Sequence, residues 1–245
     1  MKKFEVPEEI QARLVARRGR LHAYDVIDGA STALLVVDMQ NFFMKEGELM
    51  CAPAARDIVP NVSTLANAVR AAGGLVVWIV MEATEESRES WHNFHALFHP
   101  EAAGRRFASL GRHGEGYKLW HDLKPHPSDK TVVKRRYSAF IQGSSDVEEV
   151  LRSGNIETVL VAGVATNVCC DSTARDCMMR GFRTIMVSDA NASFTEAEHV
   201  AALRTFITYF GDVQSTDEVI ARVGARSGDA DARVDRSQAA AELAR

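Results

Sequence analysis

Residues 157–180 read Glu157-Thr-Val-Leu-Val-Ala-Gly-Val-Ala-Thr-Asn-Val-Cys-Cys-Asp-Ser-Thr-Ala-Arg-Asp-Cys-Met-Met-Arg180. They open with residues 158–162, an uncharged apolar run rich in β-branched side chains, which indicates a strand buried on both faces. Gly163 ends this run, and apolar residues then recur at helical spacing up to Arg180. A buried strand that leads directly into a helix is the unit of parallel α/β sheets, so these residues predict that fold class.

Cys169 lies in the first turn of the predicted helix, just after the carboxyl end of the buried strand. Thr166 or Asn167 is placed to cap this helix. A helix N-terminus favours negative charge, so the pKa of a cysteine there can be lowered, and the thiolate is the nucleophilic form. Cysteine is also a common small core residue, and these residues alone favour neither interpretation over the other.

The alternation of strand and helix extends over most of the chain, without a repeat period. It predicts an α/β fold of three αβα layers, with a six-stranded, mostly parallel, doubly wound sheet. In such sheets, ligands bind beyond the carboxyl ends of the strands, where the strand order reverses. Strands are predicted at residues 32–38, 75–81, 130–134, 158–162, 183–188 and 211–215, and helices at 56–72, 145–153, 166–180, 196–210 and 216–223.

The composition divides the 245 residues into three parts. Residues 1–29 are polar and charged and predict a helical arm, which we expect to pack on a neighbouring subunit slightly more readily than on its own domain. Residues 30–224 form the predicted domain, and residues 225–245, with almost no bulky apolar side chain, predict a disordered tail. Within the domain, residues 83–128 predict a long irregular polar segment, and loops of that length are usually functional.

The net charge of −4 gives no reason to expect nucleic acid or an anionic membrane as a partner. No apolar run approaches the roughly 18–20 residues that span a bilayer, and the N-terminus lacks an apolar signal core, so we expect a cytoplasmic protein. The cysteines lie in no zinc-binding spacing and form no disulfide framework, which fits a reducing compartment. They are Cys51, Cys169, Cys170 and Cys177.

Three predicted strands lead into residues that carry chemistry. Asp38 ends the first, Lys134 ends the third and Cys169 follows the fourth. Because parallel strands bring their carboxyl ends to one edge, we expect an acid, a base and a thiol together there. The ammonium would stabilise a thiolate, and the carboxylate would accept the thiol proton and return it to a leaving nitrogen. The alternative is a structural Asp38–Lys134 ion pair, which is costly to bury without a function.

Three segments around these residues resemble the signature blocks of the isochorismatase-like cysteine hydrolases. The resemblance covers residues 30–223, and the blocks occur in the family's order. In motif they are most similar to those of ureidoacrylate amidohydrolase, biuret hydrolase and N-carbamoylsarcosine amidohydrolase. The segments are Leu34-Leu-Val-Val-Asp-Met-Gln-Asn41, Val132-Val-Lys-Arg-Arg-Tyr-Ser-Ala-Phe140 and Val161-Ala-Gly-Val-Ala-Thr-Asn-Val-Cys169.

The resemblance implies roles for individual residues. Asp38, Lys134 and Cys169 match the catalytic triad of the family, and the N–H groups of Ala165 and Cys169 match its oxyanion hole. The peptide bond between Val164 and Ala165 is expected to be cis. Cys169 rather than Cys170 occupies the nucleophile position, and Cys170 should point about 100° away around the helix.

The resemblance also implies the reaction. Members that act on the vinyl ether of isochorismate lack the cysteine, so this chain is expected to hydrolyse a carbon–nitrogen bond of a small amide or ureide. The path would run through a thioester acyl-enzyme and release ammonia or an amine. An isochorismatase-type vinyl-ether hydrolase and a non-catalytic member of the fold are the alternatives.

Other site residues are predicted from their positions in or near these blocks. Tyr137, Asn41 and Phe43 are candidates for binding the substrate. His92 and His95 have the i, i+3 spacing that suits a metal, but no partnering acid is evident, so we expect no metal and no cofactor. By resemblance, the protein is expected to be a homodimer or homotetramer that binds a small-molecule amide or ureide.

Overall fold

The structure is a computed structural model that describes residues 4–223. Its single sheet has six strands in the order β3-β2-β1-β4-β5-β6, and every strand pair is parallel. The predicted three-layer α/β fold is confirmed, with a sheet that is parallel throughout the described residues. The strands are β1 (Thr32–Val37), β2 (Leu75–Met81), β3 (Lys130–Lys134), β4 (Thr158–Val164), β5 (Arg183–Ala192) and β6 (Asp212–Gln214).

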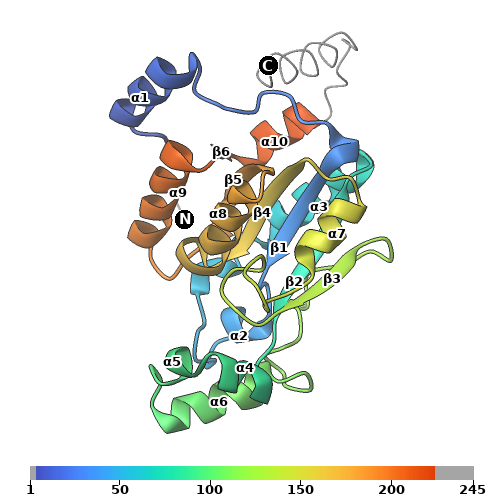
Figure 1. Cartoon of the computed structure of the whole chain (residues 1–245), viewed down its shortest axis with the longest axis vertical. Coiled ribbons are helices and arrows are strands. Elements are labelled where there is room, and N and C mark those ends of the chain that lie inside the picture. The colour runs from blue at the N-terminus through green and yellow to red at the C-terminus, as the bar shows by residue number, and fades with distance from the viewer. Residues whose placement is uncertain (1–3, 224–245) are drawn as a thin grey trace, which may run out of the picture.

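Helices cover both faces of the sheet (Figure 1). One face packs against α3 (Val59–Ala71) and α10 (Thr216–Val223). The other packs against α7 (Val147–Ser153), α8 (Asp171–Met179) and α9 (Glu196–Tyr209). The apolar spacing of these segments therefore predicted the layers correctly, with ends that differ by a few residues.

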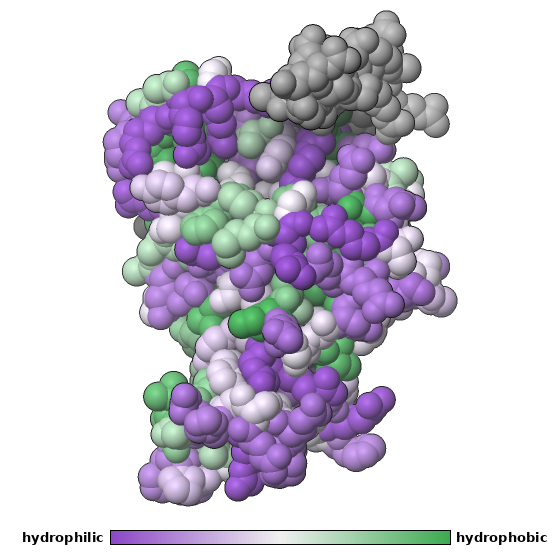
Figure 2. Space-filling view, in the orientation of Figure 1, coloured by the Kyte–Doolittle hydropathy of each residue, from purple (hydrophilic) through white to green (hydrophobic). Residues whose placement is uncertain are grey.

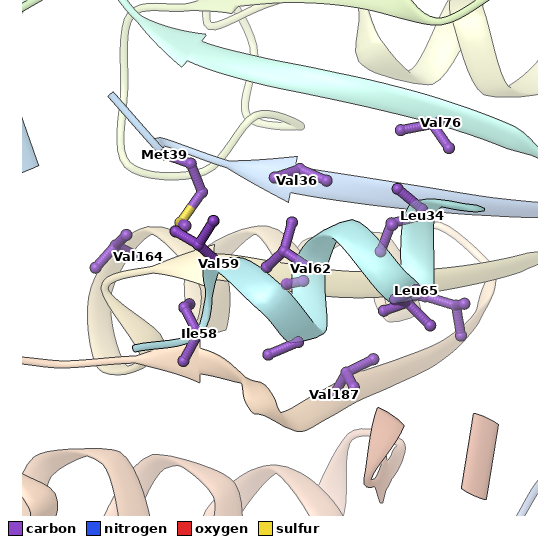
Figure 3. Packing of buried hydrophobic residues seen from close by; sticks show 14 of the residues in the cluster. Leu34, Val36, Met39, Ile58, Val59, Val62, Leu65, Val76, Val164 and Val187 are labelled. Carbon is purple, nitrogen blue, oxygen red and sulfur yellow. The ribbon is translucent and has the colours of Figure 1, made fainter. Parts of the chain in front are cut away.

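Strand β1 shows why the sheet is buried on both faces. Successive side chains of a strand point to opposite faces, and all six residues of β1 are buried. Leu34 and Val36 belong to the core cluster under α3, and Figure 3 shows them beside Val62 and Leu65 of that helix. The intervening residues face the other cluster, so an uncharged run is required.

The N-terminal arm packs on its own domain. Helix α1 (Glu8–Arg18) contacts α9, and its residues Ile10 and Leu14 are buried. Glu9 pairs with Arg204 at 2.9 Å. The buried apolar side chains of α1 therefore have a partner surface within the same domain, and packing on a neighbouring subunit stays a prediction. The predicted tail at 225–245 lies outside the described residues.

The segment 83–128 is not irregular as predicted, because three helices occupy its first part. They are α4 (Glu85–Ser90), α5 (His92–His95) and α6 (Pro100–Leu110), and Figure 1 shows them grouped near α2 (Asn41–Met44). Thr84 and Ser87 form a capping box at the start of α4, and Pro100 occupies the first turn of α6. These start signals were present in the sequence.

The connection from β4 to α8 also differs from the prediction. A short π-helix, η3 (Thr166–Cys170), precedes α8, and its N-cap residue Ala165 has no capping side chain. Thr166 instead hydrogen-bonds His199 Nδ1 at 2.8 Å, and Asn167 accepts a hydrogen bond from Ser193. Both polar side chains thus hold neighbouring segments rather than the helix end.

The surface carries mostly hydrophilic side chains on the face that Figure 2 presents, with smaller hydrophobic patches among them. Among the helices of residues 4–223, none has the length and apolar character that crossing a membrane requires.

Candidate active site

The candidate site lies where the strand order reverses. From β1 the chain builds the sheet outward through β2 and β3, and it then returns to place β4 on the other side of β1. Asp38 follows β1, and Ala165 follows β4, so the two residues leave adjacent strands. This is the crevice in which doubly wound sheets bind ligands.

Gly163 allows the ends of β1 and β4 to lie close together. Its φ is 122°, and a Cβ at this position would lie 2.0 Å from the carbonyl oxygen of Val37. The pairing register between β4 and β5 also shifts between Val161 and Gly163. Any larger residue would force the strand carrying the Ala165 turn away from Asp38.

Lys134 joins the acid to the thiol. Its Nζ lies 2.8 Å from Asp38 Oδ2 and donates to Cys169 Sγ at 3.4 Å. It also donates to the carbonyl oxygen of Arg136 at 3.1 Å and contacts Met81 Sδ at 3.4 Å. Both side chains of the ion pair are fully buried. The structure therefore brings together the three residues that the sequence placed at one sheet edge.

Burial and the neighbouring charges determine the pKa values of Asp38 and Lys134. Burial acts to lower the pKa of Lys134, but the carboxylate of Asp38, together with the hydrogen bonds to Asp38 and Cys169, outweighs burial, so that pKa is raised. Burial raises the pKa of Asp38, and Lys134 opposes this. Lys134 thus stays cationic, and Asp38 is a stronger base than an exposed aspartate.

Cys169 rests as a thiol. It is 4% exposed, and burial raises its pKa to about 12, with Lys134 lowering the value and Asp38 raising it. The sequence suggested a lowered pKa at a helix N-terminus, and that suggestion is wrong because burial and the nearby carboxylate dominate. Cys170 is fully buried and belongs to the same core cluster as Cys169, on the face of the sheet that α7, α8 and α9 cover.

The turn between β4 and η3 exposes a backbone donor. The Val164–Ala165 peptide bond is cis, as expected from the family resemblance. The N–H groups of Val168 and Cys170 both donate to the carbonyl oxygen of Ala165 at 3.1 Å. The Ala165 N–H itself donates to no other residue between 4 and 223. The turn can therefore offer this N–H to a ligand beside Cys169.

Of the three predicted substrate-binding residues, Tyr137 is connected to the triad. It follows Arg136, whose carbonyl oxygen accepts from Lys134, and its ring meets Trp91 edge-on at 5.0 Å. Burial raises the pKa of Tyr137, and the nearby sulfur of Cys169 raises it further.

Asn41 and Phe43 have structural partners instead. The Asn41 side chain donates to the carbonyl oxygen of Glu115 at 3.0 Å, which ties α2 to a loop. Phe43 packs edge-on against Phe42, with a ring separation of 5.0 Å. No contact recorded among the described residues joins either side chain to the triad.

The histidines weighed as metal ligands do not converge. His95 lies against Phe107, with 5.1 Å between the rings, and burial lowers its pKa. His92 contributes to no group of three or more His, Cys, Asp or Glu side chains that could hold a metal within residues 4–223.

Arg106 is a site residue that the sequence prediction missed. It lies on α6, is 4% exposed, and places its guanidinium 5.0 Å from the Phe94 ring centroid. Burial lowers its pKa, and the influence of Tyr137 and Cys169 opposes this shift. The residue could have been found only after α6 was recognised, because helical spacing places it on the same face as Leu110.

Known proteins resemble the chain over most of its length. The isochorismatase domain model matches residues 32–218. Ureidoacrylate amidohydrolase RutB of Variovorax paradoxus is 32% identical over 217 residues, 82% of this chain and 82% of that protein. The RutB protein of Stutzerimonas stutzeri is 33% identical over 205 residues, 77% of this chain and 81% of that protein. The crystal structure of a cysteine hydrolase from Pseudomonas syringae pv. phaseolicola has a TM-score of 0.71 and 30% identity, covering 82% of this chain and 96% of that one.

These similarities confirm the predicted class of enzyme, a cysteine hydrolase that acts on amide or ureide carbon–nitrogen bonds. They support neither of the two alternatives, which were an isochorismatase-type vinyl-ether hydrolase and a non-catalytic member of the fold. A domain match over residues 32–218, together with relatives 32% and 33% identical over most of both chains, shows that the chain belongs to the isochorismatase family.

Proposed function

We propose that the protein hydrolyses a small ureide or amide of the ureidoacrylate type, with Asp38, Lys134 and Cys169 as the catalytic residues. The observation that carries this is the position of the Lys134 ammonium, 2.8 Å from the carboxylate and 3.4 Å from the sulfur. The similarity to ureidoacrylate amidohydrolases supports the choice of substrate class.

In the first step, the sulfur of Cys169 attacks the carbonyl carbon while the thiol proton passes to Asp38. A carbon–sulfur bond forms, and the carbonyl electron pair moves onto oxygen. The N–H groups of Ala165 and Cys169 hold this oxyanion, and each such donor contributes about 3 kcal/mol in comparable sites. Lys134 stabilises the negative charge that develops on sulfur.

In the second step, Asp38 returns its proton to the leaving nitrogen as the carbon–nitrogen bond breaks. Ammonia or an amine departs, and a thioester remains on Cys169. Water then attacks the thioester while Asp38 accepts one of its protons. The carbon–sulfur bond breaks, the thiol regains its proton, and a carboxylic acid or a carbamate is released.

The reaction is tested by measuring ammonia release from ureidoacrylate, biuret, N-carbamoyl amino acids, nicotinamide and maleamate. Cys169→Ala should abolish release, whereas the matched variant Cys170→Ala, at a buried position one residue away, should retain it. Equal loss in both variants would refute the assignment of the nucleophile. Activity should persist with EDTA, since no metal takes part in these steps.

Two further properties belong with this function. We propose a homodimer or homotetramer, and elution at the size of one chain in size-exclusion chromatography would refute it. We also propose a cytoplasmic location, because all four cysteines are free and a reducing compartment would keep the nucleophile available.

A further inference from the structure

Arg106 is a buried cation without a counter-ion among the described residues. Its Nη1 has no hydrogen-bond partner. Arg70 and Arg175, which are more exposed than Arg106, each have a carboxylate partner, Asp129 at 2.7 Å and Asp171 at 2.8 Å. A buried guanidinium with no anion is costly, so an anion that arrives with a ligand would relieve the cost.

Packing places α6 beside the triad. Leu110, one helical turn after Arg106, accepts a hydrogen bond from the Ala83 N–H at 3.1 Å and shares a core cluster with Met81. The sulfur of Met81 in turn lies 3.4 Å from Lys134 Nζ. Because residues four apart lie on one helix face, Arg106 is on the side of α6 that packs at the end of β2.

Aromatic contacts give a second, independent connection. Arg106 lies over Phe94, and the Phe94 ring meets Tyr137 edge-on at 5.4 Å. Tyr137 is the residue after Arg136, whose carbonyl oxygen binds the Lys134 ammonium. The guanidinium and the phenol therefore approach the triad from α6 and from the end of β3.

The carboxylates near this position are already paired. Asp38 lies 2.8 Å from Lys134, and Glu82 lies 3.4 Å from Arg135. Neither forms an ion pair with Arg106 in the described residues. The charge left over beside the nucleophile is therefore positive.

We propose that Arg106 binds a carboxylate of the substrate, with Tyr137 beside it, and so makes the enzyme selective for anionic amides or ureides. This deepens, and rests on, the function proposed above. A planar guanidinium suits a carboxylate because two parallel N–H groups can donate to its two oxygens. A ureido acid would then be oriented by its carboxylate while Cys169 attacks its ureido carbonyl.

The test compares ureidoacrylate with its neutral methyl ester, using ammonia release from the ureido group. Arg106→Met should lower kcat/KM for ureidoacrylate on the order of 10²- to 10³-fold and leave that for the ester unchanged. Arg106→Lys should retain part of the preference. Arg105→Met is the matched control, because Arg105 is exposed and donates to the carbonyl oxygen of Gly47; it should behave as the unaltered protein.

A binding titration separates this inference from the proposed function. In Cys169→Ala protein, ureidoacrylate should bind, and adding Arg106→Met should abolish that binding even if no turnover is ever observed. Equal losses for acid and ester, or unchanged binding of the acid, would overturn the role of Arg106. Thermal unfolding of Arg106→Met should occur at the same or a higher temperature, because an unpaired charge is removed. A lower temperature with equal losses on both substrates would make Arg106 a structural cation and overturn the inference.

Discussion

Replacing Asp38 by Asn should increase the thiolate fraction of Cys169 and at the same time strongly lower turnover. The carboxylate and the sulfur lie 2.8 and 3.4 Å from the same ammonium, so they are at most about 6 Å apart. At that distance, with an effective dielectric constant of about 20, their repulsion is about 3 kcal/mol, or about 2 pKa units. The pKa of Cys169, about 12 in the unaltered protein, should fall by that amount.

The assay is a pH titration of the ultraviolet absorbance of the thiolate, with the Cys169→Ala form of each protein subtracted. Asp171→Asn is the matched control, because Asp171 is a buried acid at the start of α8, two residues after Cys169, and pairs with Arg175 at 2.8 Å. It should leave the titration of Cys169 unchanged. Turnover of Asp38→Asn should fall on the order of 10²- to 10⁴-fold, since no group accepts the thiol proton or protonates the leaving nitrogen.

Two results would refute this reasoning. If Cys169 of the unaltered protein titrates at or below the ordinary cysteine value of about 8.5, the resting state is a thiolate–ammonium pair rather than a thiol. If Asp38→Asn leaves the titration unchanged, the carboxylate is not what opposes the thiolate, and burial alone sets the pKa.

The remaining predictions concern stability and pH. Lys134→Met should lower the free energy of unfolding by about 3–5 kcal/mol at neutral pH, because Asp38 is left buried and unpaired; a loss below about 1 kcal/mol in urea unfolding would contradict this. Gly163→Ala should cost about 2 kcal/mol or more, given the 2.0 Å approach to Val37; an unchanged urea midpoint would argue against it. Burial lowers the pKa of His199 from 6.5 to about 4. Between these two pH values, His199 is protonated in the unfolded chain and neutral in the folded chain. Stability should therefore fall by about 2 kcal/mol between pH 8 and pH 5, and His199→Gln should lose that part of the slope in urea unfolding. In pH–rate profiles, kcat/KM should decline on the acid side above the ordinary aspartate value of 3.8, because the pKa of Asp38 is raised. It should stay level up to about pH 10, because the pKa values of Lys134 and Cys169 are raised as well; a fall near pH 8 would contradict this.

Local sequence was sufficient to predict the sheet and the meeting of Asp38, Lys134 and Cys169. Uncharged runs such as residues 32–37 must be buried on both faces, and parallel strands bring their carboxyl ends to one edge. The family resemblance added the cis peptide bond before Ala165, which no propensity would have indicated.

Other features depend on tertiary contacts that no local pattern contains. Thr166 has the side chain of a helix cap, but its hydroxyl binds His199, 33 residues away. The pKa of Cys169 depends on burial and on charges from two other strands, so its helix position predicted the wrong direction. Asn41 is the last residue of a signature block, yet its side-chain amide donates to the carbonyl oxygen of Glu115 in a distant loop.

The charges in the site explain why a protonated thiol suits this arrangement. Asp38 and Lys134 neutralise each other at 2.8 Å, so a resting thiolate would add a buried negative charge beside a carboxylate. With the thiol protonated, Arg106 supplies an excess positive charge, and a carboxylated substrate balances it on binding, as inferred above. In the proposed mechanism, negative charge appears on sulfur and on the carbonyl oxygen only during attack, when Lys134 and the N–H groups of Ala165 and Cys169 would hold it. Interactions of this kind are stronger in the transition state than in the ground state, which is the condition for accelerating the chemical step.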